Sequence, residues 1–170
     1  SRKLSSYSNK YICNRLNSDK YNGIFKEIKI YGCTYIGWLN IDGDYELRAI
    51  DKDCKIQKLT PNGHKKNISV INIEDGVLSV RHGILGVMDG CFDELQNKII
   101  VVTEGIFSGI SFIKNTSLNN CVLVCLNSVS NSRFLIQYMD SISTYKSRIV
   151  LALDHDKAGI YTSLELMEKL

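Results

Sequence analysis

The sequence predicts an α/β fold with a parallel, Rossmann-like sheet in its C-terminal part, preceded by a small, mainly antiparallel β lobe. Two observations carry this prediction. From residue 99 onward, three continuous apolar runs alternate with stretches of helical periodicity, as expected of strands buried on both faces of a parallel sheet. Before residue 95, short β-rich runs are separated by turn residues, a pattern typical of antiparallel hairpins. We therefore expect a basic, β-rich lobe in residues 1–95 and an α/β core in residues 96–170.

The α/β core is predicted from the order of its elements. The predicted strands are the three apolar runs at residues 99–102, 121–126 and 149–153. Ile106, Ile110 and Ile113 recur at helical spacing after the first run, and helix-forming sequence also follows the second and the third. An order in which strands and helices alternate three times predicts a parallel sheet with right-handed crossovers.

The N-terminal lobe is predicted to contain a β hairpin. Two β-rich runs, at residues 35–41 and 45–50, flank Asp42-Gly43-Asp44, and an Asp-Gly turn between such runs is a strong hairpin signal. Within this hairpin, Trp38 is expected to pack in the core rather than to stack on nucleic-acid bases. Further short strands of the lobe are predicted at residues 55–59 and 68–73, and a short helix or ordered arm within residues 1–20.

Length and composition exclude several classes of protein. A chain of 170 residues fits one domain, or one domain with a small lobe. With 44% hydrophobic and 23% charged residues, it is unlike disordered, collagen-like or coiled-coil sequences. No apolar run approaches the roughly 20 residues of a membrane helix, and residues 1–10 are followed by no apolar signal-peptide core. We therefore expect no membrane partner, a cytoplasmic location, and a fragment truncated at the C-terminal end of its α/β core.

The six cysteines do not form a recognisable zinc motif. The sequence contains no C-x-x-C pair, and only Cys121 and Cys125 are close to each other. Both fall in an apolar run whose strand alternation directs their side chains inward. We therefore expect the cysteines to be buried, reduced thiols, and we predict no zinc site.

Positive charge is concentrated in one segment of the lobe. The formal net charge is +3, and between residues 52 and 66 five lysines are accompanied only by Asp53. Such a cluster is suited to binding phosphates. A solvated hairpin face is an equally ordinary explanation, and the charge pattern alone does not decide between them.

Three carboxylates follow two of the predicted strands of the α/β core. Glu104 follows the first strand, and Asp154 and Asp156 follow the third at a spacing that directs both side chains to one side of an extended chain. Ligands of open parallel sheets bind at these carboxyl ends. Carboxylates gathered there repel one another unless they share a proton or a divalent cation, and oxygen-only ligands suit Mg²⁺ or Mn²⁺.

The neighbours of these acids are informative as well. Gly105 directly follows Glu104 and Gly159 lies just past the aspartates, so both could allow the close backbone approach that a metal-bound phosphate requires. The alternative explanation for Asp156 is that it simply caps the N-terminus of the next helix.

Together these residues resemble the Toprim domain, a metal-binding α/β module of bacterial-type primases, topoisomerases and some nucleases. Its signature is a strand ending in Glu-Gly, here Glu104-Gly105, and a later strand ending in Asp-x-Asp, here Asp154-His155-Asp156. The extension through Gly159 is similar to the Asp-x-Asp-x-Ala-Gly form of primases and phage primase-helicases. The hairpin at residues 36–48 and the stretches at residues 64–69 and 82–87 resemble segments that precede the Toprim core in bacterial primases.

The resemblance implies Mg²⁺-dependent nucleotidyl transfer, in which RNA primers are made from nucleoside triphosphates on single-stranded DNA during DNA replication. It implies that Glu104, Asp154 and Asp156 are both catalytic and metal-binding, with Mn²⁺ as a possible substitute. The residues expected to contact nucleic-acid or triphosphate phosphates are Arg48, Lys65, Lys66 and Lys157. The expected partner is a helicase or relaxase domain in the same or another chain.

Two alternatives remain open at this point. A Toprim nuclease or topoisomerase would use the same acids to cleave a phosphodiester, although nothing in this sequence marks the tyrosine nucleophile of a topoisomerase. A non-catalytic nucleic-acid-binding module of a mobile-element protein is the other alternative. Primer synthesis, cleavage of single-stranded DNA, and metal-independent DNA binding would distinguish the three.

Overall fold

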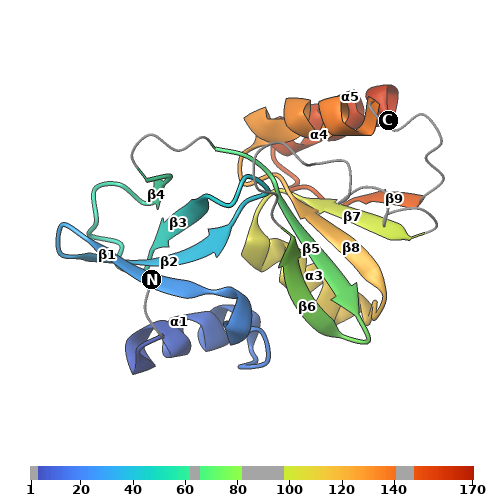
Figure 1. The fold of residues 1–170 in the computed structure, drawn as a ribbon. Coiled ribbons are helices and arrows are strands. Elements are labelled where there is room, and N and C mark those ends of the chain that lie inside the picture. The colour runs from blue at the N-terminus through green and yellow to red at the C-terminus, as the bar shows by residue number, and fades with distance from the viewer. Residues whose placement is uncertain (1–3, 62–65, 82–97, 141–147) are drawn as a thin grey trace.

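The computed structural model describes residues 4–61, 66–81, 98–140 and 148–170, which form two sheets that lie side by side (Figure 1). The first sheet is antiparallel, and a helix and a short 3₁₀ turn precede it. Its order is β1-β2-β3-β4. The bounds of these elements are α1 (Ser6–Leu16), the 3₁₀ turn (Asn22–Ile24), β1 (Lys26–Ile30), β2 (Cys33–Leu39), β3 (Tyr45–Ala49) and β4 (Lys58–Leu59).

The second sheet is mixed and has the order β6-β5-β8-β7-β9. Strand β7 runs parallel to both of its neighbours, whereas β5 runs antiparallel to β6 and β8. The strands are β5 (Ser69–Glu74), β6 (Val77–Arg81), β7 (Ile99–Thr103), β8 (Cys121–Cys125) and β9 (Arg148–Leu151). The predicted α/β class, with a separate antiparallel sheet before the parallel strands, is therefore confirmed.

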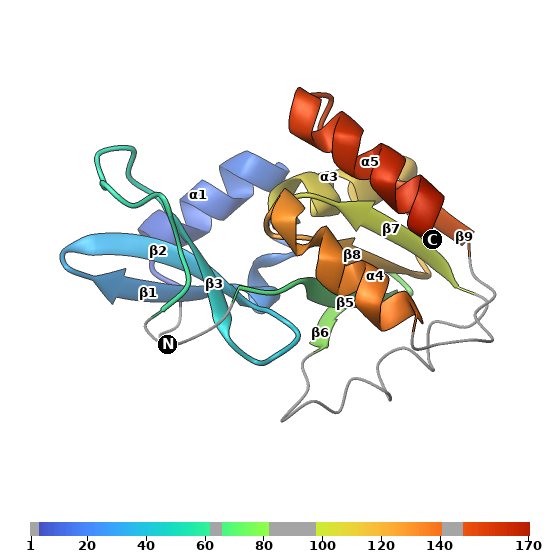
Figure 2. The ribbon, with the colours of Figure 1, turned by 90° about the horizontal axis from the view of Figure 1, so that it is seen from above.

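Helices cover both faces of the second sheet (Figures 1 and 2). They are α3 (Ile106–Thr116), α4 (Ser132–Asp140) and α5 (Lys157–Lys169). Strands β8 and β9 flank β7 on opposite sides, so right-handed crossovers place α3 on one face and α4 on the other. The two resulting cores are distinct, because Ile110 of α3 packs in one and Leu135 of α4 in the other. None of the helices in the described residues has the length and apolar character needed to cross a bilayer.

The strand expected at residues 68–73 does not belong to the lobe. It is β5, and it pairs with β8 of the second sheet. Residues 69–73 are all buried, because helices or the lobe cover both faces of the strand. A hairpin turn with positive φ at Asp75 and Gly76 then leads into β6. The expected division between residues 95 and 96 stays a prediction, since residues 82–97 lie outside the described part of the chain.

The lobe contains the expected hairpin but less of the expected fourth strand. Strands β2 and β3 pair through the predicted turn, where Asn40 Oδ1 accepts hydrogen bonds from the backbone amides of Asp42 and Asp44. The strand expected at residues 55–59 is restricted to Lys58 and Leu59. Residues 50–57 instead form a folded loop, because the side chain of Gln57 binds three of its backbone carbonyls.

An aromatic cluster joins the lobe to the second sheet. The rings of Phe25 and Phe107 are stacked with centroids 5.3 Å apart, and the indole of Trp38 meets Phe107 edge-on at 6.3 Å. Trp38 is only 7% exposed, so the prediction that it packs in the core is confirmed. Because Phe107 lies in the first turn of α3, this cluster places the lobe directly beside the end of β7.

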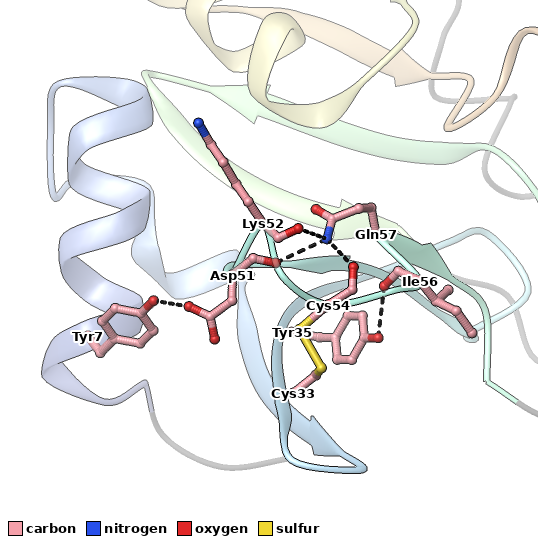
Figure 3. The surroundings of a disulfide bond; sticks show 8 residues. All are labelled: Tyr7, Cys33, Tyr35, Asp51, Lys52, Cys54, Ile56 and Gln57. Carbon is pink, nitrogen blue, oxygen red and sulfur yellow. Dashed lines mark hydrogen bonds between the residues drawn. A yellow bond between two sulfur atoms is a disulfide. The ribbon is translucent and has the colours of Figure 1, made fainter.

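The prediction of reduced thiols is wrong for one pair of cysteines. Cys33, at the start of β2, forms a disulfide with Cys54 in the loop between β3 and β4 (Figure 3). Figure 3 also shows a second contact between β2 and the loop of residues 50–57. The hydroxyl of Tyr35 donates a hydrogen bond to the carbonyl oxygen of Ile56 at 2.9 Å. The pairing depends on the folded loop and has no local sequence motif. Cys121 and Cys125, in contrast, are buried free thiols as predicted.

Removal of the disulfide should destabilise the protein. The bonded residues are 21 apart in sequence, and loop-closure entropy predicts that Cys33→Ser with Cys54→Ser lowers the free energy of unfolding by about 3 kcal/mol. Urea unfolding under oxidising conditions, followed by the fluorescence of the single tryptophan, measures this change. The matched control is Cys13→Ser, at a free cysteine, which should cost less than about 1 kcal/mol. Equal stability of the double variant and the wild type would contradict this account of the lobe.

Candidate functional site

The structure brings the three predicted acids together. Strands β7 and β9 are parallel neighbours, so the residues that follow them emerge at the same edge of the sheet. The ladder continues one residue beyond β9, where the amide of Ala152 donates to the carbonyl oxygen of Val102 at 2.8 Å. Glu104, Asp154 and Asp156 each place one carboxylate oxygen within 4.8 Å of the others.

The surroundings of Glu104 raise the pKa of its carboxyl. Partial burial raises the pKa of its carboxyl above the usual value, and a hydrogen bond with Asp154 and the charges of Asp154 and Asp156 raise it further. The nearby charge of Lys58 acts in the opposite direction. Its Oε2 is buried and has no hydrogen-bond partner among the described residues. A buried carboxylate oxygen without a donor is costly and is suited to a cation.

Asp156 has a structural role as well. Its Oδ1 accepts a hydrogen bond of 2.7 Å from the amide of Gly159 and so caps the N-terminus of α5. A carboxylate has two oxygens, so this cap and a contact to a cation are compatible. The helix-cap explanation for Asp156 is therefore correct without excluding a second role.

The two glycines beside the acids differ in what they allow. A Cβ atom on Gly159 would lie 2.0 Å from the carbonyl oxygen of Asp154, so this position tolerates no side chain. At Gly159, the group that approaches closely is thus the backbone carbonyl of Asp154 and not a bound phosphate. A Cβ atom on Gly105 would make only an ordinary contact, at 3.6 Å from Ser108 Oγ. Gly105 is not required by packing, and its small size leaves room in the cleft beside Glu104.

Glu104 lies at the edge of a cleft between the lobe and the second sheet. The cleft has a volume of about 170 Å³, and besides Glu104 and Gly105 it is lined by three basic residues of the lobe, Arg48, Lys58 and Lys66. Arg48 and Lys58 are register partners in β3 and β4, so the antiparallel pairing brings their backbones together. We call this feature the basic cleft. It places cations of the lobe next to Glu104, an arrangement suited to a phosphate chain that binds a metal at one end.

The structure distinguishes among the basic residues predicted for the site. Arg48 and Lys66 line the basic cleft, and their contact with phosphates stays a prediction. Lys157 is exposed in the first turn of α5 and does not line that cleft, and Lys65 lies outside the described residues. Lys58 is not among the residues predicted from sequence to contact phosphates, although it belongs to the lysine-rich segment of residues 52–66. Its role depends on the β3–β4 register, which no local pattern specifies.

The other acid that lines the cleft, Glu46, is unlike Glu104. It is buried, and its two oxygens accept hydrogen bonds from Asn40 Nδ2 at 3.0 Å, the Asn67 amide at 3.1 Å and Thr60 Oγ1 at 3.0 Å. A carboxylate with three donors is stabilised without a cation. The unsatisfied oxygen of Glu104 therefore distinguishes the trio as the candidate metal site.

In the metal-free protein, Glu104→Gln should raise the melting temperature at neutral pH, because it removes a charge that burial and two aspartates disfavour. The folded pKa lies above the unfolded value, so ionised Glu104 destabilises the fold above the folded pKa. The increase in melting temperature caused by the substitution should disappear as the pH falls through the pKa of Glu104 in the folded protein toward its pKa in the unfolded chain. Thermal unfolding in a chelator, at pH about 7 and pH about 4, measures this dependence.

The matched control for this experiment is Glu165→Gln, at an exposed position of α5, where the two melting curves should coincide at both pH values. A lower melting temperature for Glu104→Gln at neutral pH would show that the carboxylate is stabilised in the metal-free protein, contrary to this description.

Comparisons with known proteins agree with this geometry. The family model of Toprim-like domains matches residues 101–170, which contain all three acids. No curated protein sequence matches the chain.

Two solved structures have a similar fold. One is the primase fragment of the bacteriophage T7 primase-helicase protein, with a TM-score of 0.54 and 18% identity. The match covers 95% of this chain and 57% of the T7 fragment, so this chain spans just over half of that fragment's length. The other contains the T7 lagging-strand DNA polymerase with primase domains of two gp4 subunits bound to an RNA/DNA hybrid and dTTP. It matches with a TM-score of 0.54 and 18% identity, over 94% of this chain and 68% of the other. Residues 101–170 are therefore similar in sequence to Toprim-like domains, within a chain whose fold is similar to that of a phage primase fragment.

Proposed function

We propose that this chain carries out metal-dependent nucleotidyl transfer, making RNA primers from nucleoside triphosphates on single-stranded DNA. The observation that carries the proposal is the buried Oε2 of Glu104, which has no hydrogen-bond partner in the described part of the chain. It lies beside Asp154 and Asp156, and Glu104 lines a cleft that basic residues also line. The oxygen-only donor set fits Mg²⁺, with Mn²⁺ as a substitute.

Each residue has a distinct task in this proposal. Asp154 and Asp156 would hold the Mg²⁺ ion, and Glu104 would be a third ligand or accept, through water, the proton of the attacking hydroxyl. When bound, the ion neutralises charge on the transferring phosphoryl group. Arg48, Lys58 and Lys66 bind triphosphate or template phosphates and supply affinity without sequence preference. The proposal thus adds Lys58 to the phosphate contacts predicted from sequence, which were Arg48, Lys65, Lys66 and Lys157.

The structural comparisons support priming over other uses of the same acids. The T7 structures concern primase domains, and one of them contains an RNA/DNA hybrid and dTTP. By this likeness we propose single-stranded DNA and nucleoside triphosphates as partners of the present chain. A helicase domain in the same or another chain is proposed on the same ground, and a relaxase domain stays a prediction from sequence.

Metal binding is the first test of this proposal. Asp154→Asn with Asp156→Asn should weaken Mg²⁺ or Mn²⁺ binding at least about tenfold, because it removes two of three charged ligands. Asparagine caps helices about as well as aspartate, so the cap of α5 is retained and the variant should stay folded. Isothermal titration calorimetry measures the affinity, and Glu165→Gln serves as an exposed, charge-removing control. Unchanged binding in the double variant would place the metal elsewhere.

Activity assays then separate priming from its alternatives. With Mg²⁺, single-stranded DNA and labelled ribonucleoside triphosphates, the wild-type chain should make short RNA products, and the double variant should make none. Each alternative function would give a different pattern. Cleavage of the DNA without synthesis would indicate a nuclease-type Toprim protein. Metal-independent DNA binding with neither activity would indicate a non-catalytic module and would contradict the proposal.

A further inference from the structure

Asn127, the residue directly after β8, has an unusual backbone conformation. Its φ is 63°, in the left-handed region that few residues other than glycine and asparagine enter readily. This turn directs its backbone amide to the carbonyl oxygen of Glu104, with a hydrogen bond of 2.8 Å. The backbone of Asn127 therefore holds the backbone of Glu104.

The side chain of Asn127 points to the lobe side of the basic cleft, whose lining it shares. Its Nδ2 donates to the carbonyl oxygen of Asn67 at 2.8 Å and to Ser69 Oγ at 2.9 Å. Its Oδ1 accepts a hydrogen bond of 3.0 Å from Trp38 Nε1. One side chain thus connects the end of β8 to β2, to the start of β5 and to the segment before β5.

Two of these contacts lead to segments that carry cations of the basic cleft. Asn67 directly follows Lys66, and its amide is held in turn by the carboxylate of Glu46. Trp38 lies opposite Glu46 in the β2–β3 pairing, and Arg48 belongs to the same strand β3. Asn127 therefore links the backbone of Glu104 to the segments that carry Lys66 and Arg48.

We propose that Asn127 is a positioning residue that sets the distance between the acidic trio and the cations of the basic cleft. Both of its side-chain N–H groups already have acceptors within the protein, so it has no donor left for a substrate. It acts through Trp38 and Asn67 on one side and through Glu104 on the other. This inference rests on the proposed function, since it assumes that the cleft binds a metal–triphosphate.

Asn127→Gly tests the inference, because glycine keeps the positive φ and the backbone bond to Glu104 while it removes every side-chain contact. We expect the affinity for Mg·ATP to fall at least about fivefold, whereas the affinity for Mn²⁺ alone should stay within about twofold of the wild type. A purely structural loss would lower both affinities together. Titration calorimetry of the intact chain with MnCl₂ and with Mg·ATP, at a temperature where thermal scans show the variants folded, measures both.

Trp38→Phe tests the Trp38–Asn127 hydrogen bond from its other end, since it removes the indole donor and retains an aromatic ring. If the Trp38–Asn127 hydrogen bond is the coupling, the effects of the two substitutions on Mg·ATP affinity should be less than additive in the double variant. The matched control is Asn131→Ala. It removes a buried hydrogen bond of 2.8 Å from Nδ2 to the Leu126 carbonyl in the same loop but touches no lobe residue in the bonds described.

The outcomes separate the inference from the function on which it rests. Wild-type affinity for Mg·ATP in Asn127→Gly would overturn the positioning role while leaving the metal site intact. An equal loss in Asn131→Ala would attribute the effect to general destabilisation and would also overturn it. If the wild type binds Mn²⁺ but not Mg·ATP, the proposed nucleotidyl transfer fails, and the positioning role fails with it.

Discussion

Three carboxylates repel one another at one edge of the second sheet, and the sheet holds them together against that repulsion. Because β7 and β9 are hydrogen-bonded neighbours, the segments that carry Glu104 and the two aspartates start side by side. Glu104 is also partly removed from water, with one oxygen unsatisfied among the described residues. The arrangement is unfavourable alone and becomes favourable with a divalent cation. This balance is the physical basis of the proposed function.

The rest of the structure places the lobe against this edge. The aromatic contact between Trp38 and Phe107 fixes β2 beside the first turn of α3, which begins two residues after Glu104. The antiparallel lobe then presents Arg48 of β3 and Lys58 of β4 to the cleft that Glu104 also lines. Neither the lobe nor the Toprim-like domain contains both sets of charges, so a site of this kind requires their association.

Local patterns in the sequence predict the parts of this structure that depend on local order. The continuous apolar runs predict β7, β8 and β9, and the acids that follow them predict the trio, because parallel strand ends meet at one edge. The features that escape prediction depend on tertiary packing. Strand β5 is short and flanked by turns like the lobe strands, and only its burial on both faces assigns it to the second sheet. Likewise, the Cys33–Cys54 bond and the place of Lys58 follow from a folded loop and a strand register.

The most direct test of this account is a crystal structure of the chain soaked with Mn²⁺, with diffraction data collected at a wavelength where manganese scatters anomalously. The account predicts an anomalous peak about 2.2 Å from carboxylate oxygens of Asp154, Asp156 and Glu104, at the carboxyl ends of β7 and β9. A peak at another set of ligands, or no peak at this edge under saturating Mn²⁺, would contradict the claim that the trio is a metal site.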